Sequence, residues 1–390
     1  MSDPARLTAS AGELLERLVA FDTTSRRSNL ELIAFAEDRL GPLGATLERV
    51  GNADGSKANL IARIGPDEDG GVLLSGHTDV VPVDGQAWTS DPFTVTRRDG
   101  RLYGRGTADM KAFLALALAA APDFAAAGLK RPVQLAFSYD EEIGCLGAPS
   151  LIEALSRSGP RPATVIVGEP TDMEAVSGHK GIATFKVTVT GREAHSSLTH
   201  LGVSAIMAAA RLMTVISDLA EDLERRADPA SPFMPKGPTL TIGQIQGGTA
   251  VNILARECVF AFDLRAAPGF DARDVLKPVY EAAARLDAEL KARAPEAGVR
   301  IEARSNTPPL RPEPDGAAEQ LARRLTGDNG PARVVSYAAE AGQFQEAGFS
   351  TVICGPGSIV QAHQPDEYLE VSQLERGAAF MARLVEALAE

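Results

Sequence analysis

Residues 72–79, VLLSGHTD, begin with a short apolar run and end with polar residues, and this pattern recurs twice along the chain. The runs Val133–Ser138 and Thr164–Val167 are also short and apolar, and acidic residues follow each of them. Helical patterns lie between the runs, near Ala112–Ala121 and Ser150–Leu155. Apolar strands that alternate with helices are typical of an α/β domain with a parallel sheet. We therefore predict an α/β fold with a mostly parallel central sheet flanked by helices.

The sequence changes character from about Gly181. Residues 184–190, TFKVTVT, alternate as a half-exposed strand does, and a long helical pattern runs from Val203 to about Arg225. Further strands are expected at 238–245, 257–265 and 299–303, with a second helix near 271–294. This β-α-β-β-α-β order predicts an inserted ferredoxin-like α+β domain. The expected domain limits are 1–180 and 305–390 for the α/β domain and 181–304 for the insertion, with a linker at 305–314.

Composition restricts the class of protein. The chain has 390 residues, of which 44% are hydrophobic and 23% charged, as in ordinary globular proteins of two domains. Its net charge of −13 argues against nucleic-acid binding, which requires clustered Lys and Arg. The first residues, MSDPARLTAS, lack the basic and apolar regions of an export signal, so we expect a soluble, cytoplasmic protein without a membrane partner.

Two smaller features complete this outline. Cys145, Cys258 and Cys354 are odd in number and lack any C-x-x-C spacing, which indicates a reducing compartment and buried structural thiols. Ser10 and Glu13 form an S-x-x-E pattern before an amphipathic run, so we expect the first helix to begin there with a capping box.

His77 and Asp79 follow the first apolar run directly. Residues two apart on an extended segment point to the same side, so Asp79 can orient the His77 imidazole for metal binding. A histidine that is merely hydrogen-bonded and partly buried is the alternative for this motif taken alone. The neighbouring motifs favour the metal site, because ligands bind at the carboxyl ends of strands in open α/β sheets.

Further acids and one histidine occur at similar places. Asp109 lies in a glycine-rich turn that opens a helix, where it can cap the helix or bridge two cations. Glu141 and Glu142 end a strand, either as solvated surface acids or as a general base beside a metal ligand. Glu169 follows the third run, and His363 lies in a polar turn after a glycine-rich segment.

Together these residues predict a two-metal site. The expected ligands are His77, Asp109, Glu142, Glu169 and His363. Mixed imidazole and carboxylate ligands suit zinc or a related divalent ion such as Co²⁺, and the set is too large for one catalytic zinc. With Asp109 shared, two Zn²⁺ ions about 3.5 to 4 Å apart would activate water, and Glu141 would act as the base in amide hydrolysis.

Several longer motifs resemble a known family over nearly the whole chain. They are SGHTDVVPVDGQAWTSDPF (75–93), LYGRGTADMK (102–111), DEE (140–142), VGEPT (167–171), GREAHSS (191–197) and GPGSIVQAHQPDEYLE (355–370). In their order they resemble the zinc-dependent aminoacylase and carboxypeptidase family, which includes succinyl-diaminopimelate desuccinylases and acetylornithine deacetylases. The resemblance implies the same five metal ligands, Asp79 as the orienting residue and Glu141 as the base.

The same resemblance assigns roles to the insertion. It implies a lid that also forms a homodimer, and His195 looks like the family histidine that stabilises the oxyanion across the dimer. Asn252 and Arg265 are similar to lid residues that bind substrate, where an arginine suits an α-carboxylate. A structural salt bridge is the alternative for Arg265.

Within this family, HKG (179–181), YAAEAG (337–342) and the tail AHQPDEYLE look like acetylornithine deacetylases rather than desuccinylases. They imply hydrolysis of N2-acetyl-L-ornithine, a step of arginine biosynthesis, with Glu340 contacting the ornithine ammonium. His179 is expected to be structural and His200 to lie on the surface. The alternatives are hydrolysis of succinyl-diaminopimelate, another N-acyl amino acid or a dipeptide, and, as a different class, a non-catalytic metal-dependent binding protein.

Overall fold

The computed structural model describes residues 2–390, and the chain forms two compact units. The first unit comprises the segment that ends at Gly178, together with Leu310–Val334 and Ala339–Glu390. The second unit comprises His179–Pro309 and Val335–Ala338. The expected insertion, 181–304, falls within the second unit, whereas the sequence carries no signal for the short return at 335–338.

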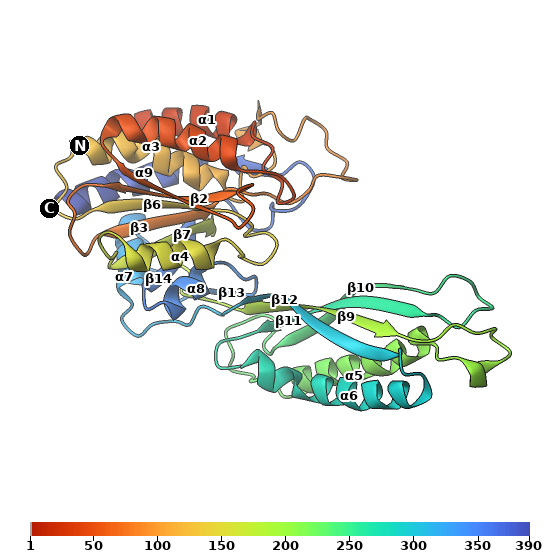
Figure 1. The fold of residues 1–390 in the computed structure, drawn as a ribbon. Coiled ribbons are helices and arrows are strands. Elements are labelled where there is room, and N and C mark those ends of the chain that lie inside the picture. The colour runs from red at the N-terminus through yellow and green to blue at the C-terminus, as the bar shows by residue number, and fades with distance from the viewer. Residues whose placement is uncertain (1) are drawn as a thin grey trace. The chain divides into compact units, whose positions relative to one another are not determined.

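A 6-stranded mixed sheet forms the centre of the first unit, in the order β1-β2-β6-β3-β7-β14 (Figure 1). Its strands are β1 (Thr46–Gly51), β2 (Ala58–Ile64), β3 (Val72–His77), β6 (Val133–Ser138), β7 (Thr164–Pro170) and β14 (Ser350–Gly355). Strands β6, β3, β7 and β14 pair in parallel, whereas β1 and β2 join on antiparallel. The predicted α/β fold with a largely parallel sheet is confirmed.

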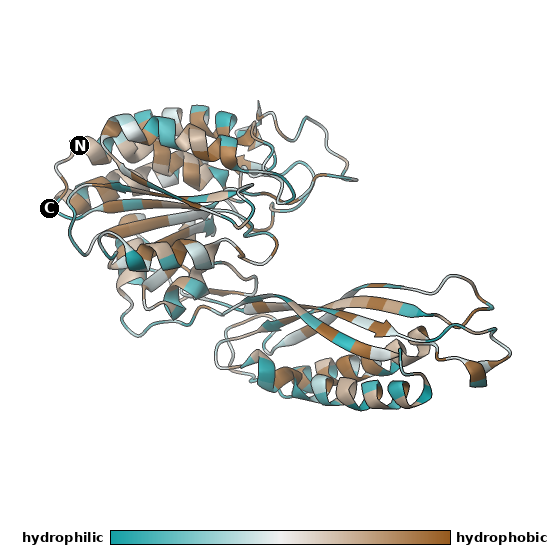
Figure 2. Cartoon of the chain, in the orientation of Figure 1, coloured by the Kyte–Doolittle hydropathy of each residue, from teal (hydrophilic) through white to brown (hydrophobic). Residues whose placement is uncertain are grey.

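Helices cover both faces of this sheet (Figure 1). On one face lie α1 (Pro4–Val19), α2 (Leu30–Leu40), α3 (Lys111–Ala126) and α9 (Val371–Ala389), and on the other lie α4 (Ala148–Arg157), α7 (Ala317–Thr326) and α8 (Ala341–Glu346). Every residue of β3, β6 and β7 is buried, which explains why these strands are apolar on both faces. Figure 2 shows these central strands as largely hydrophobic, whereas the outer helices carry hydrophilic stretches.

The start of α1 corrects one prediction. The helix begins at Pro4, and the side chain of Asp3 accepts a hydrogen bond of 2.9 Å from the backbone of Ala5. The capping box expected at Ser10 and Glu13 is therefore wrong. An aspartate cap followed by proline is a strong start signal, because proline at the first helical position needs no hydrogen bond from its nitrogen.

The chain also contains several shorter elements. A 3-stranded sheet has the order β15-β5-β4, with β4 (Thr96–Arg98), β5 (Arg101–Tyr103) and β15 (Tyr368–Glu370). The paired strands β8 (Gly178–His179) and β13 (Val334–Val335) and the 3-10 helices η1 (Gly41–Leu43) and η2 (Thr199–Leu201) complete the list. The cysteines Cys145, Cys258 and Cys354 are all buried, as predicted, and burial raises the pKa of the Cys354 thiol to about 12.

The second unit contains a 4-stranded antiparallel sheet in the order β10-β11-β9-β12, with two helices on one face (Figure 1). Its elements are β9 (Gly181–Thr190), α5 (Ala205–Arg225), β10 (Thr239–Gly247), β11 (Glu257–Ala266), α6 (Ala272–Arg293) and β12 (Gly298–Thr307). Burial alternates along β9 and β11, because one face of the sheet packs on the helices. The predicted β-α-β-β-α-β order is confirmed. No described helix has both the length and the apolar composition needed to cross a bilayer.

Candidate metal centre

Imidazole and carboxylate side chains gather at one edge of the central sheet of the first unit. His77 is the last residue of β3, Glu169 lies near the end of β7, and Glu141 and Glu142 follow β6. Strand β3 pairs in parallel with both β6 and β7, so their carboxyl ends share this edge. Asp109 joins them from the turn just before α3. The topology therefore brings together residues that are far apart in the sequence.

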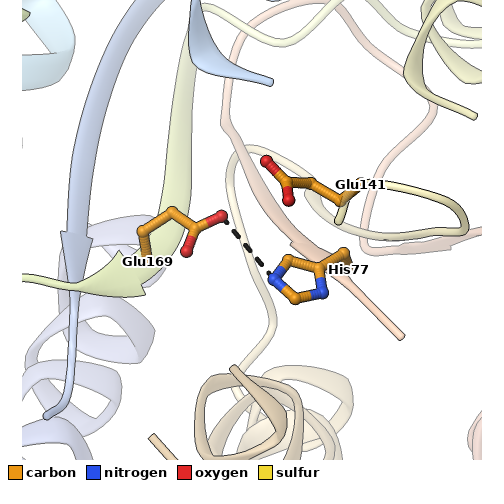
Figure 3. Close-up of side chains that lie close together, drawn as sticks. All are labelled: His77, Glu141 and Glu169. Atoms are coloured by element: carbon orange, nitrogen blue, oxygen red, sulfur yellow. Dashed lines mark ion pairs between the residues drawn. The ribbon is translucent and has the colours of Figure 1, made fainter. Parts of the chain in front are cut away.

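Asp109 lies between two histidines. Its Oδ1 is 3.0 Å from Nε2 of His77, and its Oδ2 is 3.3 Å from Nε2 of His363. The same nitrogen of His77 is 3.7 Å from Oε1 of Glu169, as Figure 3 shows. The imidazole of His363 also lies 2.9 Å from Oε2 of Glu142. Each histidine thus faces a different oxygen of Asp109 and one further carboxylate. This arrangement is expected of a carboxylate that bridges two cations.

The spacing of these groups suits metal ions. Two sets of side chains have ligand atoms within 4.8 Å of one another: His77, Glu141 and Glu169, and His77, Asp109 and Glu142. Oε1 of Glu169 is buried and has no hydrogen-bond partner among the described residues. A buried carboxylate oxygen without a partner is costly, and a bound cation would satisfy it. Nitrogen and oxygen donors in this mixture suit zinc and related divalent ions.

Electrostatics supports the same conclusion. Burial raises the pKa of Glu141 to about 8, and the neighbouring charges of Glu142 and Asp109 add to this effect. Burial, followed by repulsion from Asp109, raises the pKa of Glu142 to about 7 and that of Glu169 well above its ordinary value. Hydrogen bonds to Asp109 and Glu142 raise the pKa of His363 to about 11. So many acids crowded at one edge stay ionised at neutral pH only when positive charge lies among them.

Asp79 holds this edge together in an unexpected way. Nδ1 of His77 donates to the backbone carbonyl of Asp79 at 2.8 Å, whereas the Asp79 carboxylate is 3.8 Å away. The carboxylate instead accepts from the backbone amides of Glu141 and Glu142, at 3.1 and 3.2 Å. The carbonyl bond leaves Nε2 of His77 to face Asp109 and Glu169, as a ligand nitrogen should. The side chain of Asp79 therefore fixes the turn that carries the two glutamates.

Two neighbours of the site were not predicted. Ser25 donates its hydroxyl to Asp79 at 2.6 Å, and Cys145 donates its thiol to Oε1 of Glu141 at 3.2 Å. Ser25 lies in DTTS (22–25), a polar stretch between helices that gives no sign of its target. Cys145 follows the DEE motif by three residues, and this proximity is the one signal available in the sequence.

The residues predicted in the second unit lie mostly in loops. His195 is exposed, and its Nδ1 hydrogen-bonds the hydroxyl of Ser197 at 2.8 Å. The backbone amide of Ser196 donates to the carbonyl of Asn252 at 3.0 Å, so the segments of His195 and Asn252 lie side by side. Arg265 on β11 forms an ion pair of 3.0 Å with Asp263.

Glu340 lies in the first unit and is only 1% exposed. Its two carboxylate oxygens accept hydrogen bonds from Ser75 at 2.6 Å and from Ser138 at 2.8 Å. Burial raises its pKa, and these hydroxyl bonds partly offset that rise. Glu340 therefore links β3 and β6 close to the edge that carries the cluster.

Known proteins resemble this chain in sequence and in fold. An acetylornithine deacetylase of Proteus mirabilis (strain HI4320) is 36% identical over 370 residues, which cover 94% of this chain and 92% of the relative. An acetylornithine deacetylase of Myxococcus xanthus is 37% identical over 384 residues, covering 95% of each chain. The YXEP protein of Bacillus subtilis, described as a dinuclear metal-binding peptidase of the M20 family, shares the fold with a TM-score of 0.65 at 17% identity and 99% coverage of both chains.

The family model named Peptidase family M20/M25/M40 matches residues 73–387. This match contains every residue of the cluster, from His77 at the end of β3 to His363 before β15. The chain therefore belongs to peptidase family M20/M25/M40.

Proposed function

We propose that this protein hydrolyses the amide bond of N2-acetyl-L-ornithine and releases L-ornithine and acetate. The observation that carries the proposal is the position of Asp109, whose two oxygens face two different histidines at a sheet edge rich in acids. Similarity to two acetylornithine deacetylases over nearly the full length supports this choice of substrate. We also assign the reaction to arginine biosynthesis in the cytoplasm.

The residues present fit two divalent ions, which we propose to be Zn²⁺. One ion would be held by His77 and Glu169, and the other by Glu142 and His363, with Asp109 shared between them. The short distances between these side chains, given above, support this assignment. When bound, such ions lower the pKa of a water molecule and polarise the amide carbonyl.

Glu141 acts as the general base in this proposal. It lies beside His77 and Glu169 (Figure 3) and, unlike them, is only partly buried. Its carboxylate accepts a proton from water as the water oxygen attacks the amide carbon. Glu141 then gives this proton to the nitrogen as the C–N bond breaks. Water thus contributes OH to the acetate and H to the amine, and Glu141 is regenerated.

We propose that the inserted unit, 181–304, serves as a lid and as the contact of a homodimer. Its exposed apolar side chains support a contact surface, and they include Leu201, Met207, Ile245 and Val251. Strand β10 also lies at an edge of its sheet, where unpaired backbone groups favour association. In this arrangement His195 donates a hydrogen bond to the developing oxyanion of the substrate.

Substrate recognition is proposed to involve Arg265, Asn252 and Glu340. Arg265 would exchange its partner Asp263 for the α-carboxylate of the substrate, and Asn252 would add a hydrogen bond. Glu340 would have to release the hydroxyl of Ser75 or Ser138 to reach an ammonium group. Of the three assignments, that of Glu340 thus carries the cost of breaking a buried hydrogen bond.

The test is hydrolysis of N-acetylornithine beside succinyl-diaminopimelate and N-acetylmethionine, with zinc-loaded and chelated protein. Glu141→Ala is the variant that removes the base, and Glu153→Ala is its control, because Glu153 lies exposed on α4. We expect metal-dependent turnover with the highest kcat/KM for N-acetylornithine, lost in Glu141→Ala alone. A preference for another substrate would keep the site and overturn the specificity. Zinc binding without turnover of any substrate would favour a metal-dependent binding protein.

A further inference from the structure

A buried glutamate outside the proposed ligand set holds the segment that carries Asp109. The carboxylate of Glu367 accepts hydrogen bonds from the backbone amides of Gly106, Ala108 and Asp109, at 3.0, 2.9 and 3.1 Å. It also forms an ion pair of 2.7 Å with Arg105, and both side chains are almost fully buried. The backbone turn that presents Asp109 is thus wrapped around one carboxylate.

The same glutamate belongs to the segment that carries His363. His363 lies four residues before Glu367 and has a left-handed backbone, with φ of 64°. Its carbonyl accepts a hydrogen bond of 2.8 Å from the side chain of Gln86. Asp366 in turn accepts from the backbone and the hydroxyl of Thr89, at 2.9 and 3.0 Å. A sparsely populated backbone conformation persists only where such contacts hold it.

Arg105 joins these contacts into one network. Its Nη2 donates to the side-chain oxygen of Gln86 at 2.6 Å, and its guanidinium lies 5.1 Å from the ring centre of Trp88. The indole of Trp88 donates to the same oxygen of Gln86 at 3.0 Å. Glu367 also accepts through its backbone carbonyl from the amide of Gly104, at 2.9 Å. The segments 86–109 and 363–367 are therefore cross-linked on both sides of Glu367.

We infer that Glu367 is a positioning residue that sets the distance between Asp109 and His363, and so controls the ion that these residues share with Glu142. The inference rests on the metal centre proposed above. Glu367 would not bind an ion directly, because its two carboxylate oxygens already accept hydrogen bonds from the backbone amides of the turn and from Arg105. A carboxylate is needed here, since four donors converge on two oxygens.

The test measures zinc affinity and stoichiometry in metal-free protein by competition with a chromophoric chelator. Glu367→Gln keeps the size of the side chain but replaces one acceptor oxygen with a donor that faces other donors. We expect zinc at one of the two sites to bind about 10- to 100-fold more weakly, as for other partners of metal ligands. The kcat at saturating zinc is expected to fall more than KM rises.

Asp328→Asn is the matched control. Asp328 also binds an arginine, Arg333 at 2.6 Å, and two backbone amides, those of Gly330 and Ala175 at 2.8 and 3.3 Å. It belongs to the same unit but carries no proposed ligand on its segment. The exchange should lower stability, as the loss of any such network does, and leave zinc affinity unchanged.

Trp88 provides a second readout, because it is the one tryptophan of the sequence. The side chain of Gln86 contacts both the carbonyl of His363 and the indole of Trp88. A zinc ion that orders His363 should therefore alter the surroundings of the indole, and we expect zinc to change the Trp88 emission of the parent protein. In Glu367→Gln the change should move to higher zinc concentration, in step with the chelator measurement. In Asp328→Asn it should occur at the parent concentration.

Unchanged zinc affinity in a folded Glu367→Gln protein would overturn the inference. An equal loss in Glu367→Gln and Asp328→Asn would do the same, because it would show a general loss of stability. If Glu367→Gln does not fold, Glu367→Asp takes its place, because this exchange keeps the negative charge and shortens the side chain. We expect zinc to bind about tenfold more weakly at one site of Glu367→Asp. The zinc titrations and the Trp88 emission use no substrate, so failure to hydrolyse N-acetylornithine would overturn the proposed function and leave this inference standing.

Discussion

His77 and His195 show how differently the two units of this chain present their polar residues. His77 is 1% exposed, donates to a backbone carbonyl from one nitrogen and faces Asp109 with the other. His195 is exposed, and its Nδ1 contacts Ser197, two residues further along its own loop. Each histidine contacts a residue two positions further along, but only His77 also faces carboxylates from distant segments, those of Asp109 and Glu169.

This difference separates two kinds of functional residue. A side chain at the end of a buried strand acquires fixed neighbours as soon as the sheet forms, and its chemistry follows from them. An exposed loop histidine with a local contact can instead serve a ligand, because binding and catalytic residues are often found on loops. The following experiments test whether the buried cluster carries the chemistry and the exposed histidine assists it.

The largest effect is expected at Glu141, the proposed base in the buried cluster. Glu141→Gln should lower kcat about 10²- to 10⁴-fold, because the amide does not accept the proton of water. Zinc content, measured by elemental analysis, should equal that of the parent protein. Glu153→Gln makes the same exchange on the exposed face of α4 and should leave kcat unchanged. Full activity of Glu141→Gln would remove the base from the cluster.

A smaller loss is expected at the exposed histidine. His195→Asn should lower kcat about 10²- to 10³-fold, the usual effect of removing one oxyanion donor, with little change in KM. His200→Asn, an exchange at a second exposed histidine nearby, is the control. Equal activities of the two variants would assign His195 to the surface and confine the chemistry to the first unit.

A variant of Asp79 tests how the residues of the buried cluster are held in position. The carboxylate of Asp79 binds the amides of Glu141 and Glu142 rather than the imidazole of His77. Asp79→Asn should therefore lower kcat about 10- to 100-fold while zinc affinity changes less than about threefold. Steady-state kinetics and a chelator titration on the same sample measure both quantities. The reverse pattern, weak zinc binding with normal kcat at saturating zinc, would support orientation of His77 by Asp79 instead.

His179 is a buried histidine of the second unit, and it can be compared with the exposed His195 and His200 of that unit. Burial lowers its pKa from the ordinary 6.5 to about 4. Between pH 6.5 and 4 the unfolded chain therefore binds a proton that the folded chain does not, so stability is complete above pH 6.5 and falls as the pH drops to 4. The loss amounts to about 3 kcal/mol.

Urea unfolding of metal-free protein between pH 4 and 7 measures this slope. His179→Asn should show a shallower dependence on pH than the parent protein, and His200→Asn, at an exposed position, should match the parent. Identical slopes for all three proteins would mean that His179 does not remain neutral in the folded state.

Much of the fold could be predicted because its signals are local. Strands β3, β6 and β7 are short apolar runs in the sequence, and the β-α-β-β-α-β order of the second unit follows from alternation and helical period. The error at α1 arose from a competing local signal, since Asp3 and Pro4 start the helix before Ser10 is reached. The return of residues 335–338 to the second unit has no local signal, because it depends on packing between distant segments.

The sequence by itself determined which residues stand at the strand ends, namely His77, Glu141, Glu142 and Glu169. The runs before them are apolar, and this composition is enough to predict that they are buried strands. Only the tertiary structure decided how they are held. The carboxylate of Asp79 turns to the amides of two glutamates, and Glu367 binds the turn of Asp109 across 258 positions of sequence. The donor in each of these hydrogen bonds is a backbone amide, which every residue except proline possesses, so the identity of the donor residue carries no record of the pairing.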